Sequence, residues 1–302
     1  MRVRTRNLAL TEGITAGVLF GTAAVFIRFL QDLDVFCIAF WRVIIACLTL
    51  GVILIALGKS FNFNLVKKNL RSFFILSVFL ALHFIFFISA VNDTTILNAT
   101  VLVNTTPIFS MFVSSFLFHV KPSRLATVGL MCSFVGVCVI TCAETLTVDT
   151  NVSAKGFVPS LKGDLEAVLA ALVESFYLNY GRKLRKQMDI LPTMFPIYVL
   201  TATIIGALSI PAANKVLSLP IAGAIILPLI GLGILPTAAA HTLYFSSLSN
   251  LKSFETATMA LLEPIGATVL GITLFQEIPA PLFVLGAALI LIGILFVLRG
   301  KS

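Results

Sequence analysis

The chain contains one run after another of about 20 apolar residues with few charges between them. A helix of about 20 residues spans the hydrocarbon core of a bilayer, which is about 30 Å thick. Hydrophobic residues fill 59% of the 302 positions and charged residues only 11%, whereas about a quarter of an ordinary soluble domain is charged. The pattern predicts an all-α polytopic membrane protein with ten transmembrane helices. We expect these helices near residues 10–30, 35–57, 72–92, 94–118, 124–142, 165–182, 191–210, 221–248, 253–275 and 279–298.

Two of the apolar segments need interpretation. The stretch from Val216 to Leu251 carries no formal charge and is too long for one span, so we expect a turn outside the membrane at its start, around Pro220. The first apolar segment follows three arginines, as in a signal peptide. Because no clear small-residue cleavage site follows it, we interpret it as the first membrane span.

The net charge of +8 is concentrated in alternate connecting segments. Cytoplasmic loops of membrane proteins carry an excess of Lys and Arg, so the charge indicates orientation rather than a nucleic-acid partner. Four of the 21 Lys and Arg residues fall in outer segments and Arg42 lies within a span. The other 16, all in segments on the side of the amino terminus, are Arg2, Arg4, Arg6, Lys59, Lys67, Lys68, Arg71, Lys121, Arg124, Arg182, Lys183, Arg185, Lys186, Lys252, Arg299 and Lys301. We therefore expect a multi-pass protein of the plasma (cell inner) membrane with both termini in the cytoplasm.

Neither the cysteines nor any sequence motif points to catalysis. All five cysteines lie in apolar segments without the spacing of a metal site or a disulfide framework, so we expect packing residues, no metal and no cofactor. The chain has no His-Glu-x-x-His, no Gly-rich phosphate loop and no paired membrane aspartates, which argues against an intramembrane enzyme.

The second half of the chain repeats the first. A shift of 157 residues aligns identical residues at eight of the 30 positions 107–136, which is more than shared hydrophobicity readily gives. The aligned pairs are Pro107 and Pro264, Ile108 and Ile265, Leu117 and Leu274, Phe118 and Phe275, Pro122 and Pro279, Leu125 and Leu282, Gly129 and Gly286, and Gly136 and Gly293. Because five helices are an odd number, the second half must enter the membrane from the opposite side. We therefore expect two inverted five-helix repeats, at 1–148 and 149–302.

Over essentially its whole length the chain resembles the drug/metabolite transporter superfamily, and within it the ten-helix EamA-type permeases. The resemblance rests on Phe40-Trp41-Arg42 with Ala46, on Pro107 followed by Gly129 and Gly136, and most specifically on Leu262-Glu263-Pro264 with Glu277, Gly286 and Gly293. It implies a carrier that exports amino acids, other metabolites or drugs through a cavity formed by both halves, although some members import nucleotide-like compounds. An acidic residue that often follows the fourth helix is replaced here by His119-Val120-Lys121, so no particular member's substrate is carried over.

Two prolines are expected to break helices near the middle of the membrane. Pro107 lies about 13 residues into the fourth helix and Pro264 about 11 into the ninth. Each leaves the carbonyl four residues earlier, on Val103 and Ala260, without its usual donor. Such a carbonyl is useful where it faces a polar cavity. A kink that only shapes the bundle is the alternative.

Polar residues accompany these breaks. Asn98, Asn104 and Thr106 lie near the first and Glu263 directly precedes the second, while Glu174 lies midway along the sixth helix. A carboxyl group at mid-membrane is a functional candidate by default, and we expect Glu263 or Glu174 to couple proton movement to transport. Interhelical hydrogen bonds for the amides and hydroxyls, and a structural ion pair for the acids, are the alternatives.

Five further side chains are candidates for the cavity lining. Arg42 could snorkel to the interface, pair with an acid or orient an anionic substrate group. His83 and His241 are within one residue of equivalence in the repeat, and Tyr177 and Tyr244 offer aromatic and hydrogen-bonding surface. Each could equally be a satisfied packing residue.

The sequence thus favours a secondary transporter of small metabolites that works by alternating access around a midplane cavity. Export of amino acids or related metabolites or drugs is the expected activity. Import of nucleotide-like metabolites, or a channel-like or receptor-like protein, is the alternative. The expected partners are the lipid bilayer and a small-molecule substrate, with the chain a monomer or a homodimer.

Overall fold

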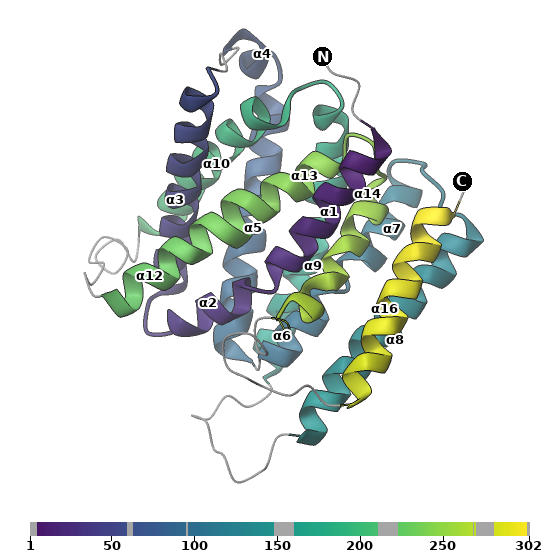
Figure 1. Ribbon diagram of the computed structural model, residues 1–302. Coiled ribbons are helices and arrows are strands. Elements are labelled where there is room, and N and C mark those ends of the chain that lie inside the picture. The colour runs from purple at the N-terminus through teal and green to yellow at the C-terminus, as the bar shows by residue number, and fades with distance from the viewer. Residues whose placement is uncertain are drawn as a thin grey trace.

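The computed structural model describes residues 5–58, 63–94, 96–147, 160–210, 223–267, 269 and 281–300, and the secondary structure in these ranges is helical (Figure 1). By length and composition, seven of the described segments could cross a membrane. They are Arg6–Phe29, Val35–Ala56, Leu70–Asp93, Asn98–Phe116, Ile190–Leu208, Gly223–Ser247 and Leu282–Arg299. The protein is therefore an all-α protein with the helices of a membrane protein. The expected turn at Pro220 lies outside the described residues.

The helices follow the expected apolar runs, but several runs are divided. The helices are α1 (Arg6–Phe20), α2 (Ala23–Phe29), α3 (Val35–Ala56), α4 (Phe63–Lys68), α5 (Leu70–Asp93), α6 (Ile96–Val103), α7 (Thr106–Phe116), α8 (Arg124–Thr147), α9 (Leu161–Arg185), α10 (Ile190–Leu208), α12 (Gly223–Leu232), the π-helix η2 (Gly233–His241), α13 (Thr242–Ser247), α14 (Ser253–Met259), the 3₁₀ turn η3 (Ala260–Leu262) and α16 (Pro281–Arg299). The short helix α4 was not predicted, because its basic sequence is typical of a loop.

The helix breaks expected at the two prolines are present. Helix α6 ends at Val103 and α7 begins at Thr106, with Pro107 in its first turn, where a missing N–H costs no helical hydrogen bond. The Val103 carbonyl accepts a hydrogen bond from the Thr106 hydroxyl at 2.7 Å. In the second half, α14 tightens into η3 before Pro264, and the Ala260 carbonyl accepts from the N–H of Glu263. Both carbonyls thus have a donor inside the protein, as a membrane interior requires.

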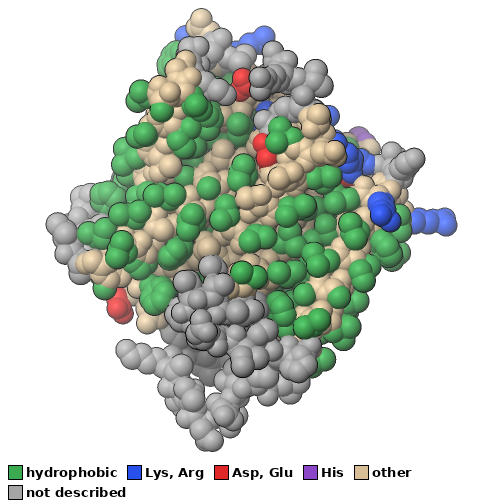
Figure 2. Space-filling view, in the orientation of Figure 1, with side chains coloured by type: hydrophobic (Ala, Val, Ile, Leu, Met, Phe, Trp, Pro, Cys, Tyr) green, Lys and Arg blue, Asp and Glu red, His purple; other side chains and the backbone are tan. Residues whose placement is uncertain are grey.

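Most helices form one bundle around a shared apolar core. Helix α5 packs along α9, α10 along α3, and α1 against α13 and η2. Figure 1 shows α1 beginning and α16 ending at the same end of the bundle, which we call the terminal end. Figure 2 shows hydrophobic side chains over most of the visible face, with the visible Lys and Arg side chains lying toward the terminal end.

Helices α8 and α16 form a close antiparallel pair at the side of the bundle (Figure 1). Gly129 lies on Gly293, and Gly136 lies on Gly286. A Cβ atom at Gly129 would come within 2.6 Å of the Phe296 Cβ, and one at Gly136 within 2.6 Å of the Gly286 carbonyl oxygen. Glycine at these crossings therefore lets the two backbones touch, which is how membrane helices gain packing contacts without a hydrophobic driving force.

We predict that Gly129→Leu destabilises the folded protein by about 1–3 kcal/mol, because the added side chain overpacks the α8–α16 contact. Thermal unfolding of the purified protein in detergent measures the effect. Val128→Leu is the matched control, since Val128 is 56% exposed on the same helix. Equal melting temperatures for the two variants would contradict this role of Gly129.

Candidate functional site

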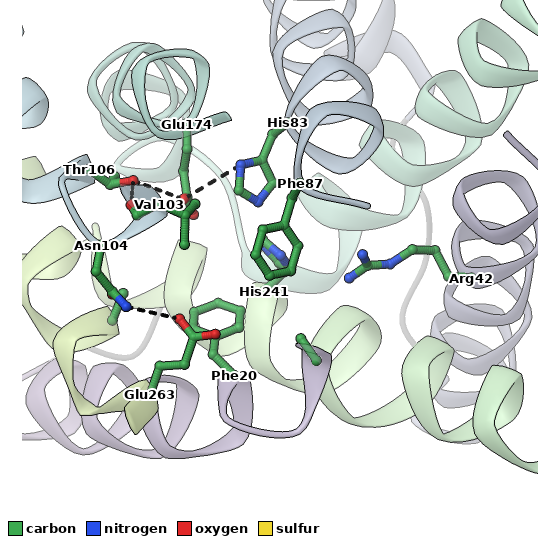
Figure 3. A pocket seen from close by; sticks show the side chains of 12 residues that line it. Phe20, Arg42, His83, Phe87, Val103, Asn104, Thr106, Glu174, His241 and Glu263 are labelled. Atoms are coloured by element: carbon green, nitrogen blue, oxygen red, sulfur yellow. Dashed lines mark hydrogen bonds and ion pairs between the residues drawn. The ribbon is translucent and has the colours of Figure 1, made fainter. Parts of the chain in front are cut away.

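A polar cavity lies inside the bundle where the broken helices meet, and Figure 3 shows the side chains that line it. The lining residues are Phe20, Ala23, Arg42, His83, Phe87, Val103, Asn104, Thr106, Glu174, His241, Ala260 and Glu263. We call this the central cavity. It encloses about 40 Å³ of water-accessible space, which is room for water but not for a metabolite. The helices around it must therefore separate before anything larger enters.

Glu263 enters the central cavity from the break in the second half. Its side chain is only 6% exposed, and Asn104, from the break in the first half, donates to its Oε2 from Nδ2 at 3.4 Å (Figure 3). The same Asn104 amide also donates to the Thr100 carbonyl at 2.8 Å. The two helix breaks thus lie face to face, joined by a carboxyl–amide contact.

Glu174 enters from the middle of α9 and contacts two residues of the first half. Thr106 Oγ1 lies 3.3 Å and His83 Nδ1 3.6 Å from its Oε2 (Figure 3). His83 Nδ1 also lies 3.1 Å from the Ala170 carbonyl oxygen. A carboxyl beside an imidazole and a hydroxyl, all buried, can exchange a proton over a short distance.

Arg42 is buried on the other side of the central cavity, with 1% of its surface exposed. Its Nε donates to Thr237 Oγ1 at 3.0 Å, and its guanidinium carbon lies 4.1 Å from the centre of the Phe84 ring. Among the described residues, no carboxylate lies within 4.0 Å of it, and its Nη1 has no hydrogen-bond partner. Arg42 therefore neither snorkels to the interface nor pairs with an acid of the described residues, which were two of the roles expected for it. Thr237 holds the guanidinium through Nε, so Nη1 remains as a donor for a substrate.

Aromatic rings separate Arg42 from the carboxyl groups. The His241 ring lies edge-on to Phe20 at 4.8 Å, to Phe84 at 4.9 Å and to His83 at 5.7 Å between ring centres. The two histidines that are nearly equivalent in the repeat therefore meet inside the protein. With the ring of Phe20, they lie between the cationic side and the carboxyl side of the central cavity (Figure 3).

Five of the expected site residues do not line the central cavity. The prolines Pro107 and Pro264 shape the breaks without facing it. Tyr177 donates to Met194 Sδ at 3.6 Å, and the Tyr244 ring packs edge-on against Phe20. Asn98 lies six residues before Asn104, about 9 Å along a helix, and donates instead to Asp164 at 3.2 Å.

Some lining residues carried no signal in the sequence. Phe20, Phe87, Val103 and Ala260 are ordinary residues of apolar helices, and only the fold brings them to the cavity. The described residues contain no group of three His, Cys, Asp or Glu side chains placed to hold a metal ion.

Comparison with known proteins identifies the family. The EamA-like transporter family matches the chain twice, over residues 8–142 and again over 161–299. The chain belongs to this family. It is thus a multi-pass membrane transporter with two EamA repeats, within the drug/metabolite transporter superfamily, and not an enzyme.

The fold of this EamA-like protein has been seen before. A solved crystal structure of a protein superposes on it with a TM-score of 0.78, covering 97% of this chain and 96% of the other. The two sequences are 18% identical, so the likeness concerns the fold alone. No curated protein sequence matches the chain.

We predict that Thr237→Val lowers the free energy of unfolding by about 1–3 kcal/mol, because the buried Arg42 Nε loses its acceptor. Thermal unfolding measures the loss, and Thr237→Ser, which keeps the hydroxyl, should restore most of it. Thr203→Val is the control, since the exposed Thr203 hydroxyl bonds only its own helix. Similar melting temperatures for Thr237→Val and Thr203→Val would show that Thr237 does not hold Arg42.

Proposed function

We propose that this protein is a secondary carrier that moves a small organic molecule across the plasma membrane by alternating access to the central cavity. The observation that carries the proposal is that both halves line one cavity at their breaks. Arg42, His83, Asn104 and Thr106 come from the first half, and Glu174, His241, Ala260 and Glu263 from the second. A site shared in this way opens to one side or the other when the halves rock.

The finer architecture in this proposal is ten transmembrane helices in two inverted five-helix repeats, divided near residues 148 and 149. The contacts of α8 with α16 support the inversion. The repeat pairs Gly129 with Gly286 and Gly136 with Gly293, whereas the contacts join Gly129 to Gly293 and Gly136 to Gly286. Exchanging each glycine for its repeat partner turns one contact into the other, as a local twofold axis requires. Ser133 Oγ also donates across this interface to the carbonyl of Ile290, its own repeat partner.

The proposed orientation places the terminal end in the cytoplasm. The basic ends of α4, α8 and α9 and the start of α1 lie on this side, where the positive-inside rule puts them. At the opposite end, ion pairs and hydrogen bonds join the two halves. Lys162 Nζ lies 2.7 Å from Asp93 Oδ2, and Thr94 donates to Asp164 at 2.9 Å. Alternating access requires these contacts to break when the outer side opens.

Glu263 and Glu174 are the proposed proton-coupling groups. Each is buried, each belongs to the second half, and each contacts a polar residue of the first half. Gain or loss of a proton therefore changes the interaction between the halves as well as the charge of the site. This is the property that a coupling group needs, because a ligand shifts a conformational equilibrium only through different interactions with the two states.

We predict that Glu263→Gln stays folded and no longer responds to an imposed pH gradient when reconstituted in liposomes. The amide keeps the shape and removes the titratable group. Because Glu263 contacts the Asn104 amide rather than a cation, the replacement leaves no buried charge unpaired. Glu255→Gln is a carboxyl-to-amide control, since Glu255 pairs with Arg6 away from the central cavity. A pH response that persists in Glu263→Gln and in Glu174→Gln would reject proton coupling by these acids.

Export of amino acids or related metabolites is the proposed activity, with the chain acting as a monomer or a homodimer. Counterflow in liposomes against labelled amino acids, nucleosides, organic cations and sugar phosphates identifies the substrate class. Saturable counterflow supports the carrier. Unitary conductance without counterflow would instead make the protein a channel.

A further inference from the structure

A second cavity lies at the terminal end of the interface between α7 and α9. Its lining residues are Ser114 in α7, Phe118 and Val120 just after α7, Asn179, Arg182 and Lys183 in the last turns of α9, Lys186 at its C-cap, and Ser253 at the start of α14. We call it the basic cavity. It holds about 230 Å³ of water-accessible space, far more than the central cavity.

The basic cavity is strongly cationic. Arg182 is held by a hydrogen bond from its Nε to the Leu251 carbonyl at 3.0 Å, while Lys183 and Lys186 are exposed. Within the described ranges, no carboxylate lies within 4.0 Å of these three side chains. Glu255, the acid of α14, forms an ion pair with Arg6 at 2.9 Å and accepts a hydrogen bond from the backbone N–H of Lys252 at 2.7 Å. Glu255 still acts on Arg182 through space, but it does not line the cavity. The lining thus holds three cations and no carboxylate, which attracts a carboxylate or phosphate group.

A buried polar track leads from the basic cavity to the central cavity. On α7, Thr106, Ser110 and Ser114 follow one another at intervals of four residues, so they share one face of the helix. On α9, Glu174 lies at the central end of this track and Asn179 about 7.5 Å further along. Polar side chains at a membrane-protein helix interface that both begins and ends at a cavity are suited to a hydrated passage rather than to apolar packing.

Asn179 closes this track in the structure. Its Nδ2 donates to the Ser110 Oγ at 3.0 Å, and the Ser110 and Ser175 carbonyls lie 3.2 and 2.9 Å away. The amide thus ties α7 of the first half to α9 of the second. These bonds join the two halves on the line between the two cavities, so they must break before this line can open.

We infer that the basic cavity is the inner vestibule of the carrier, that it admits a substrate bearing an anionic group, and that Asn179 with Ser110 gates its passage to the central cavity. The inference rests on the proposed function. Arg42 supports the same chemistry, since this cation lines the central cavity and its Nη1 has no hydrogen-bond partner among the described residues. The substrate's anionic group is attracted first by Lys183 and Lys186 and then received by Arg42.

Charge selectivity at the vestibule is tested with thiol reagents of opposite charge. The full chain, with its five cysteines replaced and Ser114→Cys added, is reconstituted in phosphatidylcholine vesicles. The reagent is then added on the side of the membrane that the terminal end faces. A sulfonate-bearing methanethiosulfonate should react about tenfold faster than a trimethylammonium-bearing one, each relative to a free thiol. Lys183→Gln with Lys186→Gln should bring the ratio to about one, whereas Lys67→Gln with Lys68→Gln, on α4, should leave it unchanged. Equal rates in the parent would overturn the proposal that the vestibule admits anions. Protection of Cys at 114 by added phosphatidylglycerol would also overturn it, because it would assign the cavity to a lipid headgroup.

The gate is tested with Ala260→Cys in the central cavity, in the same cysteine-free background. Asn179→Ala should raise the rate at which the sulfonate reagent reaches this cysteine from the inner side several-fold. Ser110→Ala should raise it less, because the Ser110 carbonyl still accepts, and Gln187→Ala, at an exposed amide on the end of α9, should have no effect. An unchanged rate in both Asn179→Ala and Ser110→Ala would overturn the gate.

The outcomes separate the inference from the function on which it rests. If Cys at 260 is reached from neither side under turnover conditions, the proposed carrier itself is wrong. If it is reached from both sides without charge preference and without an effect of Asn179, the carrier stands and only the vestibule and its gate are rejected.

Discussion

The structure depends on the cost of burying ionisable groups in a membrane. Glu174, Glu263 and Arg42 are each at most 6% exposed, at positions where lipid would offer no hydrogen bonds. The bundle has to supply partners for them, and it does so with hydroxyl, amide and imidazole groups rather than with opposite charges. Because these partners are weak, each buried group can give up its partner to bind a proton or a substrate. A tight buried ion pair would prevent this exchange.

The two helix breaks follow from the same constraint. A proline that interrupts a spanning helix exposes a carbonyl, and here Thr106 and the η3 turn satisfy the two carbonyls locally. The remaining polar groups around the breaks, Asn104 and Glu263, then face each other across the halves. Both interruptions border the central cavity, so residues of both halves line it. Close glycine contacts between α8 and α16 hold the last helices of the halves together at the side of this site.

Much of this could be predicted from the sequence, because bilayer thickness and charge placement constrain helices more strongly than any soluble environment does. Seven of the ten expected spans and the two breaks followed from apolar length and from the prolines. Glu174, Glu263, Asn104 and Thr106, chosen as polar residues within spans, line the central cavity. The sequence did not show which polar side chains face the central cavity. Asn98 has the same chemistry as Asn104 but lies further along the chain, where Asp164 takes it. The position of a residue along its predicted span could not show that Thr237 holds Arg42, or that Phe20 and Phe87 line the cavity. These contacts join segments that are far apart in the chain. The basic cavity was not predicted, because its cations were interpreted only as signals of membrane orientation.

The central claim is that the two halves move against each other around one site, opening its two ends in turn. Spin-label distances measure this most directly, with one pair at the terminal end, Leu117→Cys and Gln187→Cys, and one at the opposite end, Asp32→Cys and Leu161→Cys, all at exposed positions in a cysteine-free background. The account predicts reciprocal changes under turnover conditions: populations in which the first pair is wide have a narrow second pair, and the reverse. Distances that stay fixed while transport proceeds, or that widen together at both ends, would contradict alternating access.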